Sequence, residues 1–354
     1  MKILDRYIAV TIIVSTLLAL LVLLVLDGFF SFVTEIGNIG RGQYGLPQAL
    51  LFVLLTLPNR ASEMMPMATV LGALLGLGAL ANHSELVAIR AAGISTQRIV
   101  WSALRAGLMV VVAAIVVGEF IAPPSEQYAQ RMRALAESQH IVWQSDDGFW
   151  ARDGMNFVNI KQILPGGRLN GIDIYQFDPD HRLREATYAR TAIYMDKKWW
   201  LQGVKQSYIG KDGVVTREQG NVTWDALLSP DVLKVVIVNP GDLSIWELQK
   251  YITYLRDNGL DAKSYQLALW NKLIAPLTTL VMLLFAVPFA FGPLRSAGSG
   301  QRIVVGVLIG VGFYLFSQIL GHLGQVYGLN PLFSAAFPPL LFFSAGVVAL
   351  YKLH

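Results

Sequence analysis

Six long apolar stretches are the feature that most constrains this chain. A helix needs about 20 apolar residues to cross the hydrocarbon core of a bilayer. By that measure the 354 residues contain six candidate spans, at 8–33, 46–81, 99–121, 267–291, 303–327 and 331–350. Hydrophobic residues make up 54% of the chain and charged residues only 15%, which is unusual for a soluble protein. The sequence therefore predicts a multi-pass membrane protein.

The second apolar stretch, at residues 46–81, is too long for one straight span, and Pro58 and Pro66 lie within it. Proline removes a backbone hydrogen bond of a helix and tends to kink or break it. We therefore expect the first part of this stretch to lie along or above the outer membrane surface, before a kinked span descends.

The basic residues near the span ends predict the orientation. One side has Lys2, Arg6, Arg90, Arg98, Arg295, Arg302 and Lys352, and the other has Arg41 and Arg60. Because short cytoplasmic loops carry the excess of Lys and Arg, both termini are expected in the cytoplasm. This bias explains the net charge of +4. The basic residues are scattered rather than clustered, so nucleic acid is not an expected partner.

The long segment between the third and fourth spans differs from the rest of the chain. It contains short alternating stretches such as NFVNIKQI (156–163), GIDIYQF (171–177), GVVTREQGNVTW (213–224) and DVLKVVIV (231–238), bounded by Gly, Pro, Asp or Asn. This pattern predicts antiparallel strands, in a sandwich or roll at about 138–238. Helical patterns at 124–137 and from Leu243 to Gly259 flank it. The predicted organisation is 1–122 in the membrane, 123–265 exported and 266–354 in the membrane.

A search for chemistry-bearing motifs finds no candidate centre. No segment matches the G-x-x-x-x-G-K-[ST] pattern of a nucleotide-binding loop, and no G-x-S-x-G elbow occurs. The chain has no cysteine, and its five histidines are dispersed along it. We therefore expect no catalytic residues, no metal site and no cofactor in this chain.

A short helix is predicted at about 83–93, between the second and third spans. Ser84 can cap its start, Glu85 lies in its first turn and Gly93 marks its end. Two interpretations remain open at this point. The helix is either an amphipathic connector resting on lipid headgroups, or a coupling helix whose exposed Glu85 and Arg90 enter a groove on a separate ATPase.

The outer end of the predicted bundle has a different set of candidates. Leu21, Val25 and Phe29 share one face of the first span and would form an apolar wall. The candidate cations at its rim are Arg41, Arg60, Arg131 and Arg133. Guanidinium groups suit phosphates, so a phosphorylated lipid headgroup would meet them here. The acids Asp27 and Glu119 are expected to snorkel at the interface.

Several motifs along the chain carry a family resemblance: LDRYI (4–8), PMA (66–68), LGALLGLG (71–78), SEL (84–86), AAG (91–93), LSI (243–245) and FGPLRS (291–296). Together they resemble the lipopolysaccharide export permeases, the LptF/LptG family. The resemblance implies six transmembrane helices with a periplasmic antiparallel β-jellyroll, in the inner membrane of a Gram-negative bacterium. It also implies a complex with the LptF permease subunit, a dimer of the LptB ATPase that binds ATP and magnesium, and LptC.

The same resemblance implies a role for particular residues. Glu85 matches the coupling-helix glutamate that faces the ATPase, and Arg133 matches a basic residue in contact with lipopolysaccharide at the cavity mouth. Some relatives carry lysines just after the first span, where residues 36–44 (IGNIGRGQY) offer only Arg41. We expect phosphate contacts there to be weaker, or to shift to Arg41 and Arg60.

Two other classes of protein share parts of this pattern. A secondary transporter would need polar groups deep within its spans or broken helices in corresponding positions, and these spans are mostly apolar. A membrane-anchored scaffold would have the same composition without needing an exposed coupling helix. Copurification of a separate ATPase, lost on changing Glu85, would separate both from a transport subunit.

Overall fold

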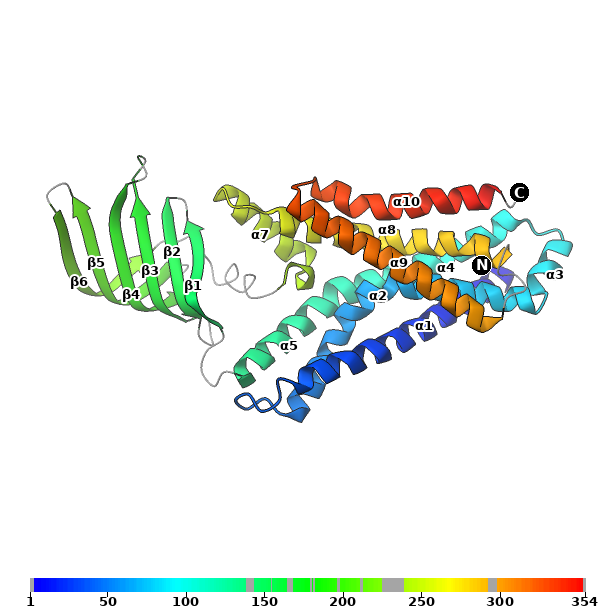
Figure 1. The fold of residues 1–354 in the computed structure, drawn as a ribbon, viewed down its shortest axis with the longest axis horizontal. Coiled ribbons are helices and arrows are strands. Elements are labelled where there is room, and N and C mark those ends of the chain that lie inside the picture. The colour runs from blue at the N-terminus through cyan, green and yellow to red at the C-terminus, as the bar shows by residue number, and fades with distance from the viewer. Residues whose placement is uncertain are drawn as a thin grey trace.

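The computed structural model describes residues 3–137, 143–153, 155–163, 168–178, 180, 182–195, 198–210, 213–224, 239–291 and 298–352. Figure 1 shows a helical bundle with a β-sheet beyond one of its ends. The two termini lie together at the opposite end of the bundle, beside the short helix α3 (Glu85–Ala91).

Six helical segments are long and apolar enough to cross a membrane, so the six predicted spans are confirmed in the described part of the chain. The first two are α1 (Ile3–Ile36) and α2 (Leu46–Asn82). The third runs through α4 (Thr96–Val116), a π-helical turn at Val117–Ile121 and α5 (Ala122–Glu137). The last three are α8 (Lys263–Phe291), α9 (Ser299–Val326) and α10 (Pro331–Tyr351).

The second span is longer than a single membrane crossing requires. Pro58 and Pro66 lie inside α2, which is one unbroken helix of 37 residues. At ~1.5 Å per residue it is about 55 Å long, whereas the hydrocarbon core is about 30 Å thick. The part outside the core is therefore an extension of the span rather than a separate segment.

Small residues allow the helices to approach closely. A methyl group added at Gly72 of α2 would lie 2.3 Å from the Cα atom of Thr16 in α1. One added at Gly310 of α9 would lie 2.5 Å from Met67 of α2. Without side-chain bulk at these positions, dispersion contacts can hold the helices together within lipid. These glycines are packing residues between spans.

The segment between the third and fourth spans contains a six-stranded antiparallel sheet whose strands pair in chain order. The strands are β1 (Trp143–Asp153), β2 (Asn156–Ile163), β3 (Leu169–Phe177), β4 (Leu183–Met195), β5 (Lys198–Gly210) and β6 (Gly213–Trp224). One face buries alternate apolar residues, including Val158, Ile160 and Ile172, around Trp199. The predicted class of six spans with an antiparallel β domain is confirmed. The strand predicted at 231–238 lies outside the described residues.

Helix α7 (Ile245–Asp257) connects the sheet to the bundle, after a short 3₁₀ turn at Pro240–Asp242. Its start is a capping box, because the Ser244 N–H donates to Glu247 and the Glu247 N–H donates back to the Ser244 hydroxyl. Leu248 and Leu255 are buried in a cluster with the start of α8, and Tyr254 also packs against the core of the sheet. The helix predicted after Leu243 is therefore present and contacts both parts.

Candidate functional site

The short helix α3 lies between α2 and α4 at the end of the bundle remote from the sheet (Figure 1). Its Leu86 is buried in the bundle core, whereas Val87 and Arg90 are exposed. Ser84 precedes the helix but does not cap it as predicted. The chain turns tightly after α2, Ser84 adopts a left-handed φ of 60°, and its side chain makes no capping hydrogen bond.

Glu85 is held by the first span. The Tyr7 hydroxyl in α1 donates a 2.8 Å hydrogen bond to Glu85 Oε2. Glu85 is half-buried and Tyr7 is exposed, so the pair lies at the surface of the bundle end. The hydrogen bond joins α3 to α1, a contact that the sequence pattern did not indicate.

A second contact holds the segment just before α3. Arg302 of α9 is 1% exposed, and its guanidinium donates a 2.7 Å hydrogen bond to Asn82 Oδ1, at the last residue of α2. The arginine lies across Gly78, where an added methyl group would be 2.5 Å from Arg302 Nε. Arg302 is thus a buried positioning residue rather than a free charge at the membrane surface.

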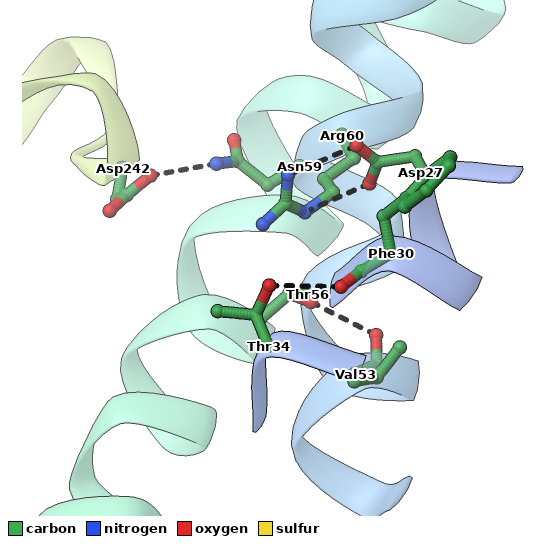
Figure 2. A network of polar contacts seen from close by, with 8 residues as sticks. All are labelled: Asp27, Phe30, Thr34, Val53, Thr56, Asn59, Arg60 and Asp242. Carbon is green, nitrogen blue, oxygen red and sulfur yellow. Dashed lines mark hydrogen bonds and ion pairs between the residues drawn. The ribbon is translucent and has the colours of Figure 1, made fainter. Parts of the chain in front are cut away.

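At the other end of the bundle, Arg60 is already paired. Its Nε lies 3.2 Å from Asp27 Oδ2 and its Nη1 lies 3.3 Å from Asp27 Oδ1, so the guanidinium binds the carboxylate with two nitrogens. Figure 2 shows this pair between α1 and α2. The prediction that Asp27 snorkels at the interface left out this partner, an arginine 33 residues away.

Arg133 of α5 is held by Glu35 of α1, whose side chain is only 6% exposed. Arg133 Nε lies 3.3 Å from Glu35 Oε1, and the Tyr44 hydroxyl donates to the same oxygen at 2.7 Å. The guanidinium also lies over the Phe52 ring, 5.1 Å from its centroid. A buried acid thus orients Arg133 across the outer ends of α1, α2 and α5.

The remaining predicted site residues have exposed side chains. Leu21, Val25 and Phe29 are 60%, 63% and 62% exposed on one face of α1. Arg41 and Arg131 are also exposed, and among the described residues neither is in an ion pair. The structure therefore divides the four rim arginines into two that are paired with acids and two that are open.

Polar contacts fix α7 to three spans. Asn59 of α2 donates a 2.7 Å hydrogen bond to Asp242 Oδ1 (Figure 2), and Glu119 of the π-helical turn accepts one of 2.9 Å from the Ile245 N–H. Lys272 of α8 donates to the Leu243 carbonyl. Glu119 therefore satisfies a backbone donor at the start of α7 instead of snorkelling, which corrects the prediction.

The two acids at this junction respond oppositely to their surroundings. Burial raises the pKa of Asp242 above its usual value, although hydrogen bonds from Asn59 and Asn239 and the charge of Lys272 oppose it. Burial also acts to raise the pKa of Glu247, but hydrogen bonds from Ser244 and Gln127 outweigh it, so its pKa is lowered.

Several residues that make these polar contacts were not predicted from the sequence. Tyr7, Glu35 and Arg302 pair with residues far away in the chain. The contact of Lys272 could have been predicted, because a lysine inside an otherwise apolar span needs a polar partner. Within the described residues, no group of three His, Cys, Asp or Glu side chains could hold a metal ion.

Comparison with known proteins gives the family. Residues 6–352 match the family model described as lipopolysaccharide export system permease LptF/LptG. The chain is 39% identical over 344 residues to the lipopolysaccharide export system permease protein LptG of Escherichia coli strain K12, covering 96% of both chains. It is 38% identical over 341 residues to the protein of the same name from Haemophilus influenzae, covering 96% of this chain and 95% of that one. The chain therefore belongs to the LptF/LptG family of lipopolysaccharide export system permeases.

Proposed function

We propose that this chain extracts lipopolysaccharide from the outer leaflet of the inner membrane and passes it to a periplasmic bridge, driven by a separate ATPase. In this proposal it pairs with an LptF subunit, contacts an LptB ATPase dimer through α3 and associates with LptC. Residues 1–122 and 266–354 are the membrane part, and residues 123–265 are the periplasmic part.

Family membership supplies the frame for this proposal. The chain is a multi-pass, non-catalytic permease subunit that works with other components of the lipopolysaccharide export system. Family members need no cofactor of their own, because ATP hydrolysis belongs to a separate subunit. The scaffold and secondary-transporter alternatives are set aside on the same ground.

The observation that carries the mechanism is that α1 links the two candidate sites. It contacts α3 at one end of the bundle and carries the exposed apolar residues toward the other end. Near its start, Tyr7 binds Glu85 of α3, and in its outer half it presents Leu21, Val25 and Phe29. The 34 residues of α1 span about 50 Å at ~1.5 Å per residue. A rigid helix of that length can carry a displacement of α3 to the apolar face.

The proposed orientation places α3 and both termini in the cytoplasm. They lie at one end of the bundle and the sheet lies at the other (Figure 1). The excess of Lys and Arg in the short loops at the α3 end supports this choice, even though Arg302 is buried and does not contribute to it.

On the outer side, the acyl chains would contact the exposed face of α1 and the phosphates would meet the arginines. Arg41 and Arg131 are exposed, so an incoming phosphate would reach their guanidinium groups first. Arg60 and Arg133 are held in place by Asp27 and Glu35, so a phosphate must approach their remaining N–H groups. Pre-positioned guanidinium groups lose less side-chain entropy on binding than mobile ones.

The ATPase contact can be tested with Glu85→Ala and Glu85→Lys in the purified complex. We expect both variants to lower ATPase copurification and ATP turnover, with Lys more severe because it reverses the charge. The matched control is Glu218→Ala, an exposed acid in β6. Unchanged assembly and turnover in both Glu85 variants would refute the assignment of α3 as the coupling helix.

A further inference from the structure

An open cavity of about 760 Å³, lined by residues of α1 and α4 and the turn before α4, lies at the end of the bundle near α3. Its volume is within the ~300–1,000 Å³ range of small-ligand sites. The side chains that matter for its chemistry are Asp5, Gln97, Arg98, Trp101, Ser102 and Arg105. None of them belongs to the apolar face of α1 or to the outer arginines, so this cavity is separate from the proposed transport path.

The cavity has a surplus of positive charge. Among the described residues that line it, the one acid is Asp5, which is buried, with Oδ1 accepting a 2.7 Å hydrogen bond from Ser102 and Oδ2 lying 3.5 Å from Arg105 Nη1. Arg105 balances the charge of Asp5, and Arg98 adds a second guanidinium on the same wall. The cavity therefore has two cations and one anion, and it is suited to one more negative charge.

The position of the cavity in the spans indicates the kind of ligand. Arg105 immediately precedes the apolar run 106–118 of the third span, and Asp5 lies three residues before the apolar run that starts at Ile8 of α1. At ~1.5 Å per residue, these charges are within one helical turn of the hydrocarbon boundary. Trp101, 63% exposed on the same wall, is the residue type that favours the headgroup level.

We propose that this cavity binds the phosphate headgroup of an anionic phospholipid in the leaflet at the α3 end of the bundle. Arg98 binds the phosphate, Arg105 contributes its charge while it keeps Asp5 paired, and Trp101 lies against the glycerol region. Basic pockets between transmembrane helices on the cytoplasmic side are suited to such headgroups. The proposal requires only that the helices span a membrane, and it does not depend on the proposed role of α3.

A lipid bound at this site would strengthen the contact between α1 and α4. The Asp5 contacts join the two helices, so a lipid phosphate beside Arg98 and Arg105 reinforces that junction. In the proposed orientation this lipid is a bound structural ligand of the permease rather than the transported one, because it enters from the leaflet opposite to the one from which lipopolysaccharide is extracted.

Native mass spectrometry of the purified complex with its ATPase tests this, with phosphatidylglycerol as the probe and phosphatidylcholine as the neutral competitor. We expect preferential retention of phosphatidylglycerol and a loss of roughly three- to ten-fold in Arg98→Gln, allowing for solvent screening at this half-exposed site. Arg98→Lys should keep most of the binding, because the charge remains. Arg6→Gln is the matched control, since Arg6 is exposed at the same end and does not line the cavity.

Four outcomes would overturn the proposal. The first is equal retention in Arg98→Gln and the unmodified chain, and the second is an equal loss in Arg6→Gln. The third is displacement of phosphatidylglycerol by inorganic phosphate as effectively as by lipid, which would assign the cavity to a soluble anion. The fourth is binding only in the absence of the ATPase, which would make the cavity part of a protein contact. Thermal unfolding of each variant checks that the fold is retained.

Discussion

Tyr7 and Glu85, which lie 78 positions apart in the chain, are joined by a 2.8 Å hydrogen bond between the Tyr7 hydroxyl and the Glu85 carboxylate. The bond connects the first membrane span to the short helix α3, which contacts the ATPase in our proposal. It gives α3 a direct link to the helix that carries the exposed apolar face.

Tyr7→Phe should weaken coupling while leaving the complex assembled. The change removes one exposed hydrogen bond and little volume, so we expect the amount of lipid released per ATP hydrolysed to fall but not to vanish. The measurement is ATP-driven lipid release and ATP turnover on the same preparation. Tyr351→Phe, at an exposed tyrosine of α10, is the control. An unchanged ratio would show that the Tyr7–Glu85 bond carries no coupling.

Gly78→Ala should destabilise the chain by about 1–3 kcal/mol, because the added methyl group must displace the buried Arg302 guanidinium. Gly312→Ala is the matched control, since no atom lies within 4 Å of a methyl group added there. Thermal unfolding in the same detergent compares the two. Equal unfolding temperatures would contradict the close packing of Arg302 on α2.

The Glu35–Arg133 ion pair predicts how the stability of a single variant compares with that of a double variant. Arg133→Ala leaves the carboxylate of Glu35 buried without its ion pair, whereas Arg133→Ala with Glu35→Gln does not. We expect the single variant to lose about 1–3 kcal/mol of stability and the double variant to recover most of it. If Arg133 also contacts the lipid phosphate, the double variant recovers stability without recovering lipid binding. Recovery of both would assign Arg133 a purely structural role.

The two acids at the start of α7 predict opposite dependences on pH. The pKa of Asp242 is raised in the folded state, so its contribution favours folding at low pH and is lost as pH rises from about 3.8 through the folded pKa. The pKa of Glu247 is lowered, so its contribution is present above about 4.5 and is lost as pH falls through the folded pKa.

Asp242→Asn should therefore make the protein more stable than the unmodified chain near neutral pH. It should also reduce the loss of stability that the unmodified chain shows as pH rises. Glu247→Gln should cost about 0.5–2 kcal/mol near neutral pH, because it weakens the capping box and the contact with Gln127. Unfolding temperatures between about pH 3 and 8 give both slopes, because the contribution of Glu247 is lost only below about pH 4.5. A matching sign of the two slopes would show that the junction differs from the one described.

The spans and most strands were predictable because they depend on local patterns. Twenty apolar residues specify a membrane helix wherever they occur, and alternation at 156–163 and 213–224 gave β2 and β6. The Ser244–Glu247 capping box similarly marks the start of α7 within four residues.

The side-chain pairs were not predictable in the same way. Glu35 with Arg133 and Asn82 with Arg302 depend on which helix faces meet, and no local pattern specifies that. The prediction of a Ser84 cap was wrong for a related reason. The residue type suits a cap, but the tight turn after α2 forces a left-handed backbone in which the side chain does not reach the helix start.

The apolar face of α1 as the lipid path is the central claim, and photo-crosslinking from a reactive analogue at Phe29 tests it most directly. Leu308, an equally exposed position on α9, is the control. During ATP-driven extraction we expect lipopolysaccharide to be captured from position 29, and capture to fall when Glu85→Lys uncouples the ATPase. If extraction proceeds while position 29 captures no more lipopolysaccharide than position 308, then the exposed face of α1 is not the substrate path.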